Sequence, residues 1–155
     1  MKKLFVACSA ICIATLAVGQ SKEVKIEAKD VPEAITKKFT AFYSDVKKVK
    51  WEKDSIWYEA EFVQNKTETS VTFSADGNII EKEWEIKKTE FPKAVSDSLA
   101  KNFAGFKIEE VSKVEKSGLV IYEAEINGKK DGKKVEYIAV YSSDGKLINK
   151  REIKD

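Results

Sequence analysis

Two pairs of glutamates are the residues of this chain whose type and spacing best suit chemistry. Glu59 and Glu61 alternate with apolar residues, and Glu123 and Glu125 do the same in a matching segment. In an extended strand such side chains point to one face, roughly 7 Å apart. Glycoside hydrolases place two carboxyl groups at comparable separations, and hard cations prefer carboxylate oxygens. The pairs therefore raise two hypotheses, a carboxylate hydrolase and a cation-binding protein, the latter also served by Asp76 and Asp144.

Other residue types that hydrolases and nucleotide-binding enzymes use are missing from the sequence. The chain contains no histidine, which excludes imidazole zinc sites, Ser–His triads and histidine general bases. Its glycines are isolated, so it has no P-loop or dinucleotide fingerprint. Because the glutamate pairs occur in both copies of a repeat, an ordinary solvated strand face explains them better than catalysis. We predict that the protein is not an enzyme and has no cofactor or resident metal.

Each copy of the repeat begins with a proline-headed helix pattern. Val31-Pro32-x-Ala34-Ile35 recurs as Phe91-Pro92-x-Ala94-Val95, and Asp30 is expected to cap the first helix. The spacing i, i+4, i+7, i+8 predicts one apolar face in each helix. The residues on these faces are Ile35, Phe39, Phe42 and Tyr43 in the first copy and Val95, Leu99, Asn102 and Phe103 in the second.

The apolar period then changes from about 3.6 to 2, which predicts strands. The expected strands are residues 46–53, 56–63, 67–74 and 79–86 in the first copy and 108–116, 119–126, 135–142 and 147–153 in the second. Asp76-Gly77 and Asp144-Gly145 predict hairpins, hence antiparallel pairing. We predict an α+β fold of two tandem units, residues 20–86 and 87–155, each one helix followed by a four-stranded antiparallel sheet. No flexible linker separates the units, so we expect the sheets to continue edge to edge.

The alternation also assigns a candidate partner-binding face. Tyr58, Ala60 and Phe62, like their copies Tyr122, Ala124 and Ile126, should pack under the helices. Their neighbours must point to the other side, and the candidate face there consists of Trp57, Glu59, Glu61, Ile121, Glu123, Glu125, Ile138 and Val140. Trp57 either packs against the other unit or anchors a partner, since tryptophan is enriched at interface hot spots. The pattern does not fix which way Trp51 and Trp84 point.

The first residues have the pattern of a targeting segment. Lys2 and Lys3 precede an apolar run from Leu4 to Val18, and small residues end at Gly19. We expect residues 1–19 to be a signal peptide cleaved near Gly19, leaving a periplasmic or secreted chain without a stable membrane anchor. A retained anchor and lipid modification at Cys8 are the alternatives. Cleavage would remove both cysteines, leaving no disulfide.

The charge balance indicates no nucleic-acid partner. Removal of Lys2 and Lys3 brings the 28 basic residues level with the 26 acidic ones. Lysines and glutamates are interspersed, whereas nucleic-acid binding needs a basic patch or stripe. We therefore predict no nucleic-acid binding.

The repeated motifs resemble those of a known family. The two proline-headed helices lead through short strands to Tyr-Glu-Ala-Glu at residues 58–61 and 122–125 and then to an Asp-Gly hairpin. From about residue 24 to the end, the chain is similar to the PepSY-like, β-lactamase-inhibitor-like family of secreted bacterial proteins. The resemblance implies a concave sheet, which the namesake inhibitor uses to clasp an enzyme, and a periplasmic or extracellular location. The disulfides and inhibitory loop residues of the namesake have no match in this sequence.

The sequence therefore predicts a non-enzymatic binding module of the cell envelope, whose partner is a protein or peptide. The resemblance implies an inhibitor or modulator of an envelope hydrolase or peptidase. The alternative is a periplasmic protein that binds a small ligand or a cation. Function is expected where the two copies diverge: Trp57 against Ile121, Trp84 against Glu152, and the longer lysine-rich loop around Asp131.

Overall fold

The structure, a computed structural model, describes residues 24–153. The predicted signal peptide and its cleavage site near Gly19 lie outside the described residues. The helices are α1 (Glu33–Phe42) and α2 (Lys93–Asn102), each preceded by a 3₁₀ turn, η1 (Ala28–Asp30) and η2 (Lys88–Glu90). The strands are β1 (Val24–Ile26), β2 (Val49–Asp54), β3 (Trp57–Gln64), β4 (Thr67–Ser74), β5 (Ile79–Glu85), β6 (Lys107–Lys116), β7 (Leu119–Lys130), β8 (Lys133–Ser142) and β9 (Leu147–Ile153).

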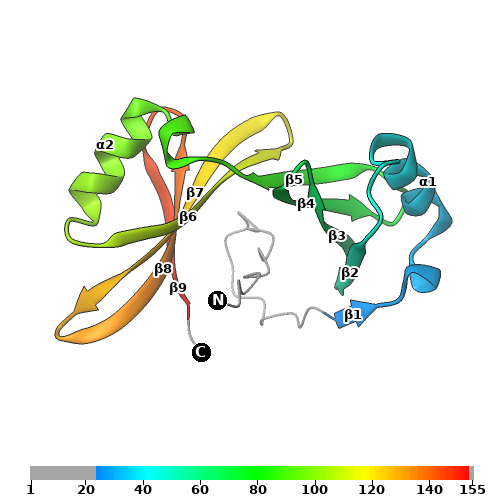
Figure 1. The fold of residues 1–155 in the computed structure, drawn as a ribbon, viewed down its shortest axis with the longest axis horizontal. Coiled ribbons are helices and arrows are strands. Elements are labelled where there is room, and N and C mark those ends of the chain that lie inside the picture. The colour runs from blue at the N-terminus through cyan, green and yellow to red at the C-terminus, as the bar shows by residue number, and fades with distance from the viewer. Residues whose placement is uncertain (1–23, 154–155) are drawn as a thin grey trace.

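The nine strands of the described residues form one antiparallel sheet in the order of the chain, β1 to β9. The expected continuity between the two units is confirmed, because β5 pairs directly with β6 from Glu81↔Lys116 to Glu85↔Ser112. Figure 1 shows the sheet arching between two ends, each with one helix. The sheet is an open surface with two edges; β1 to β5 contribute to the apolar cluster under α1, and β6 to β9 to the cluster under α2.

Two details differ from the expected layout of four strands after each helix. β1 precedes α1 and pairs with β2, so the first unit contributes five strands. The β7–β8 hairpin is also longer than expected, because the lysine-rich segment continues both strands to a tight turn at Asp131 and Gly132. These two residues have φ values of 53° and 79°, the left-handed pair that a two-residue type I′ turn requires.

Each helix packs on the same face of the sheet. Ile35 and Phe39 of α1 are buried, as are Val95 and Leu99 of α2. The sheet residues beneath them are those predicted, including Ala60 and Phe62 under α1 and Ala124 and Ile126 under α2. The opposite face of the sheet is covered by neither helix. We call these the helix-bearing and helix-free faces.

Two expectations about α1 are wrong. Asp30 does not cap the helix; it lies in η1, and Pro32 occupies the N-cap position without a side-chain hydrogen bond. Phe42 was expected in the core but is 56% exposed. The reason is that Tyr43, one residue later, fills that place, with ring centroids 5.1 Å from Phe39 and 4.7 Å from Phe62.

The repeated Asp-Gly turns dock on the repeated helix starts. Gly77 and Gly145 have φ values of +86° and +84°, and each lies against the backbone of the alanine in the proline motif. A Cβ on Gly77 would lie 2.9 Å from the Ala34 carbonyl oxygen, and one on Gly145 would lie 2.6 Å from the Ala94 carbonyl carbon. Ser74 and Ser142 donate to the Asp76 and Asp144 carboxylates, which lowers the pKa of both aspartates. The carboxylates of Asp76 and Asp144 therefore stabilise the two turns.

Among residues 24–153, no helix is long and apolar enough to cross a membrane.

Candidate functional site

The register places the eight predicted face residues on the helix-free face. Ala60 pairs with Trp51 and Val71, which lie in the cluster under α1, so its neighbours Glu59 and Glu61 point away from the helix. In the second unit Glu123 pairs with Val140 and Glu125 with Ile138. The structure thus brings these residues to one face, but it divides them into two chemically different areas.

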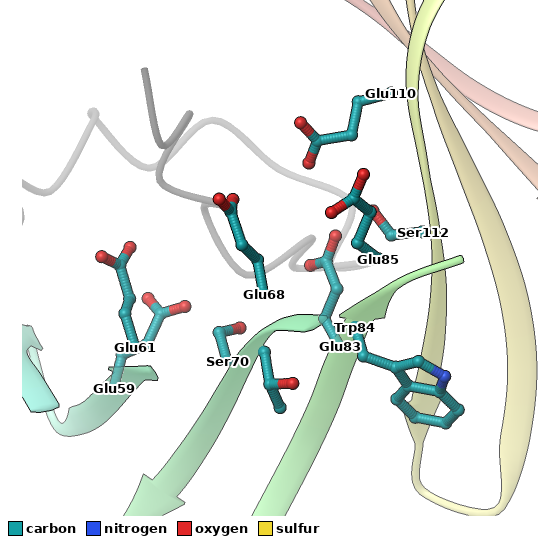
Figure 2. Close-up of a pocket in the computed structure, with 10 residues that line it drawn as sticks. Glu59, Glu61, Glu68, Ser70, Glu83, Trp84, Glu85, Glu110 and Ser112 are labelled. Atoms are coloured by element: carbon teal, nitrogen blue, oxygen red, sulfur yellow. The ribbon is translucent and has the colours of Figure 1, made fainter. Parts of the chain in front are cut away.

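The first area is an acid-lined cleft where the two units join. It runs across β3, β4, β5 and β6, and Figure 2 shows its carboxylates on one side of the strands with the Trp84 ring on the other. We call it the acidic cleft; its helix-free-face lining is Glu59, Glu61, Glu68, Ser70, Glu83, Glu85, Glu110 and Ser112. The cleft encloses only about 50 Å³. Pockets for small ligands usually hold about 300–1,000 Å³, so this cleft suits individual side chains of a partner.

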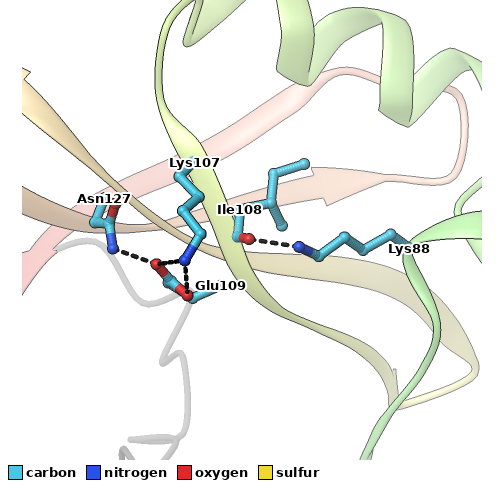
Figure 3. A network of polar contacts seen from close by, with 5 residues as sticks. All are labelled: Lys88, Lys107, Ile108, Glu109 and Asn127. Carbon is cyan, nitrogen blue, oxygen red and sulfur yellow. Dashed lines mark hydrogen bonds and ion pairs between the residues drawn. The ribbon is translucent and has the colours of Figure 1, made fainter.

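A β-bulge aims Glu110 into the cleft. The register of β6 against β7 passes from Ile108↔Ile126 to Glu110↔Glu125, which leaves Glu109 as the extra residue. Ile108 packs against the core under α2, and the extra residue reverses the alternation so that Glu110 faces the opposite side. Glu109 receives hydrogen bonds from Lys107 at 2.8 and 2.9 Å and from Asn127, while Lys88 donates to the Ile108 carbonyl (Figure 3). These bonds hold the bulge in place.

Some carboxylates of this face have lysine partners within the chain. Lys116 pairs with buried Glu81 at 2.7 Å, and Lys50 approaches buried Glu61 at 3.5 Å. Burial raises the pKa of Glu61, nearby Glu52 raises it further, and Lys50 opposes both effects. Burial, together with Glu136 and Glu109, likewise raises the pKa of Glu125. The electrostatic potential at the helix-free face is therefore negative, and it disfavours the ionisation of further carboxyl groups there.

The second area is a small apolar cluster in the second unit. Ile121, Ile138 and Val140 pack with Val114 on the helix-free face, apart from the clusters under α1 and α2. Glu123 is buried and Glu125 half-buried beside this cluster, and neither lines the acidic cleft. The two glutamate pairs are thus not equivalent: the first borders the cleft and the second flanks the apolar cluster.

The three tryptophans have three different environments. Trp51 is buried under α1. The sequence pattern alone did not fix which way its side chain points. Trp57 is half-buried at the start of β3, between Asp54 and Ser74 in the register, and lies outside the lining of the acidic cleft. Trp84 pairs with Thr69, which opposes Phe62, so it lies on the helix-bearing face. Trp57 is therefore at most a rim residue of the candidate site.

Sequence reasoning missed most of the cleft, including four of its six glutamates. Glu68, Glu83, Glu85 and Glu110 were not among the predicted residues, although Glu81, Glu83 and Glu85 alternate along β5 as clearly as Glu59 and Glu61 do along β3. In residues 24–153, no group of three or more His, Cys, Asp or Glu residues is arranged to hold a metal ion.

Substitution of Glu61 by glutamine is expected to stabilise the fold near neutral pH. The folded protein binds a proton at Glu61 more tightly than the unfolded chain, whose pKa is near 4.5, so stability falls as pH rises from 4.5 through the raised folded pKa. Urea unfolding should give Glu61→Gln a larger free energy of unfolding than wild type near neutral pH. The difference should shrink as the pH is lowered. Asp144→Asn is the opposite control, because a lowered pKa stabilises the fold above pH 3.8. A Glu61→Gln variant less stable than wild type at neutral pH would contradict this reading.

The fold and its uncovered face define an α+β protein made of a tandem helix-and-sheet repeat. The chain belongs to the family described as "Putative beta-lactamase-inhibitor-like, PepSY-like", whose model matches residues 18–81 and 58–149. The predicted family is thereby confirmed. The family description is that of an inhibitor-like protein. No curated protein matches the chain.

Solved structures from Bacteroides have the same fold. A protein of B. eggerthii described as a "putative periplasmic" protein superposes with a TM-score of 0.72 at 22% identity, covering 79% of this chain and 89% of that chain. A DUF2874 family protein of B. uniformis gives 0.69 at 22% identity, covering 78% and 88%. A BLIP-like protein of B. fragilis gives 0.63 at 19% identity, covering 80% and 88%. At these identities the likeness shows the fold.

Proposed function

We propose that this protein is a non-enzymatic binding module of the bacterial envelope that engages a protein or peptide through its helix-free face. The observation that carries the proposal is the acidic cleft, whose lining on β3 to β6 crosses the junction of the two units on the helix-free face (Figure 2). A sheet with helices on one face leaves the other available for contact.

The chemistry of the cleft selects the kind of partner. Glutamates from four adjacent strands favour a cationic segment, and the shallow volume accepts lysine or arginine side chains better than a small molecule. The apolar cluster of Val114, Ile121, Ile138 and Val140 lies on the same face and suits the apolar part of the same partner. Trp57 contributes at the rim.

Location and role follow from the relatives and the sequence. The predicted signal peptide and the relative described as periplasmic support a periplasmic or secreted protein, without a stable membrane anchor after cleavage. The family description and the BLIP-like structure support an inhibitor or modulator of an envelope hydrolase or peptidase. The alternative, a cation or small-ligand carrier, gains no support from the volume of the cleft or from the arrangement of its carboxylates in the described residues.

Charge reversal in the cleft tests this function. Glu68→Lys with Glu85→Lys should weaken binding of a fluorescein-labelled octalysine peptide by about tenfold or more, a cost of about 1.4 kcal/mol, measured by anisotropy at low salt. The same variant, used as bait in a periplasmic extract with chemical crosslinking, should lose the partner that wild type captures. Trp57→Ala in parallel should weaken capture by less than about 1 kcal/mol, because Trp57 lies at the rim and not at the centre of the site.

The matched control is Glu152→Lys. Glu152 is an exposed strand glutamate that pairs with Tyr137 and therefore lies on the helix-bearing face. Each single cleft variant, Glu68→Lys or Glu85→Lys, makes the same change of charge as Glu152→Lys, so the control should leave intact the capture that each of these weakens. Equal loss in the control and the cleft variant would mean that net charge, and not the cleft, governs binding, and the proposal would be wrong.

A further inference from the structure

A second groove lies on the helix-bearing face, beside α1 and on the opposite side of the sheet from the acidic cleft. Its volume is about 340 Å³, within the range of small-ligand sites. It is formed by the residue after α1, the β3–β4 hairpin, and the strands β4, β5 and β6. Its lining includes Tyr43, Gln64, Asn65, Thr67, Lys82 and Trp84.

Aromatic side chains form part of this groove without belonging to the core. Trp84 is in none of the apolar clusters of the described residues, although it lies on the face that the helices cover. Phe42, 56% exposed, lies beside Tyr43 at 6.4 Å between ring centroids, and the Lys82 ammonium reaches to 5.6 Å from its ring. Exposed rings beside a groove are apolar platforms with an electron-rich face.

Amide and hydroxyl groups complete the lining. Asn65 and Thr67 from the hairpin and Gln64 from the end of β3 supply donors and acceptors. A pyranose ring presents C–H bonds on its faces and hydroxyl groups around its edge, so it needs an aromatic surface together with such neutral polar groups. The combination in this groove matches a saccharide better than it matches a purely apolar ligand.

The charges around the groove favour a sugar that carries a carboxylate. Lys82 lines the groove, and Lys113 Nζ lies 4.9 Å from the centroid of the Trp84 ring. Glu115 also lines the groove, but it pairs with Lys113 at 3.2 Å, and nearby Asp45 accepts from Gln64 at 3.1 Å. Lys38 and Lys66 add positive charge at α1 and the hairpin. We propose that this groove binds an acidic oligosaccharide containing hexuronic acid.

The groove is not a requirement of the repeated fold. The residue that corresponds to Trp84 in the second copy is Glu152, and the one that corresponds to Phe42 is Asn102. In the second copy the last strand, β9, is an edge of the sheet that residues 24–153 form, so within these residues no neighbouring strand closes the groove. The aromatic residues therefore occupy positions where the scaffold accepts polar ones. The groove and the acidic cleft lie on opposite faces of the sheet and share Thr69 and Trp84 of their linings. The proposal does not rest on the partner-binding function.

Isothermal titration with trigalacturonate and with its neutral counterpart galactotriose tests the proposal. Wild type should bind the acidic trimer saturably and more tightly than the neutral one by about tenfold. Trp84→Ala should lower affinity for the acidic trimer at least about tenfold, and Lys82→Gln should remove the preference for it over the neutral trimer. Trp84→Phe, which keeps an aromatic surface, should retain partial binding and controls for loss of folding.

Trp57→Ala is the control on the other face and should bind like wild type. Absence of saturable binding of trigalacturonate up to about 10 mM, where affinity would be near 3 kcal/mol or less, overturns the proposal. Equal affinity for the neutral trimer, or undiminished binding by Trp84→Ala, also overturns it.

Discussion

Gly145→Ala is expected to destabilise the protein by about 3 kcal/mol, and to lower its melting temperature by about 10 °C. Two costs add. The residue has a φ of +84°, which costs an L-residue about 1–2 kcal/mol, and the new Cβ would lie 2.6 Å from the Ala94 carbonyl carbon, so the β8–β9 turn must move off α2. Urea and thermal unfolding followed by circular dichroism measure the loss.

Gly118→Ala separates these costs. Gly118 has a φ of +78°, but a Cβ there would meet nothing within 4 Å. Gly118→Ala should therefore lose only the stability that the backbone conformation costs, about 1 kcal/mol. If both variants lost equal stability, docking of the turn on the helix would contribute nothing.

Phe39→Ala is expected to cost about 4 kcal/mol and to abolish the near-ultraviolet signal of packed aromatic rings in the first unit. The Phe39 ring lies 5.4 Å from Trp51 and 5.2 Å from Phe62, centroid to centroid, both edge-on, and the side chain is buried. Its removal leaves a cavity at the centre of the cluster under α1. Chemical unfolding and near-ultraviolet circular dichroism report the two effects together.

Phe42→Ala, three residues later on the same helix, is the matched control. Since Phe42 is 56% exposed, its truncation should cost less than about 1 kcal/mol and leave the Trp51 signal unchanged. A loss comparable with that of Phe39→Ala would mean that Phe42 is a core residue after all.

The repeat explains which parts of the fold were predictable. Helices, hairpins and the facing of β3 and β7 followed from two independent segments with one pattern, and the structure agrees with them. β1 was missed because three residues are too few to show a period. The extension of β7 and β8 was missed because four lysines around Asp131 read as a loop, whereas the hairpin turn needs only Asp131 and Gly132.

The candidate site was only partly predictable, for a physical reason. Glu59 and Glu61 lie in a strand with strict alternation, so their facing followed from the sequence. Glu110 faces the cleft only because Glu109 forms a bulge, and a bulge reverses the alternation without a sequence signal in the strand itself. Trp84 could not be placed because it shares its face of β5 with Lys82, opposite a row of glutamates, so neither face has the apolar pattern of a core. Only its pairing with Thr69 decides.

The strand order has a consequence for how quickly the chain can fold. Every strand pairs only with its neighbours in sequence, so the contacts of the sheet are local, and most are closed by a short turn. Chains with low contact order fold fast because little loop entropy is lost before contacts form. Only the β1–β2 and β5–β6 pairs must close across a helix. A chain that emerges from its N-terminus can therefore add one hairpin at a time, and the β5–β6 pairing that joins the units can form only after α2 has been made.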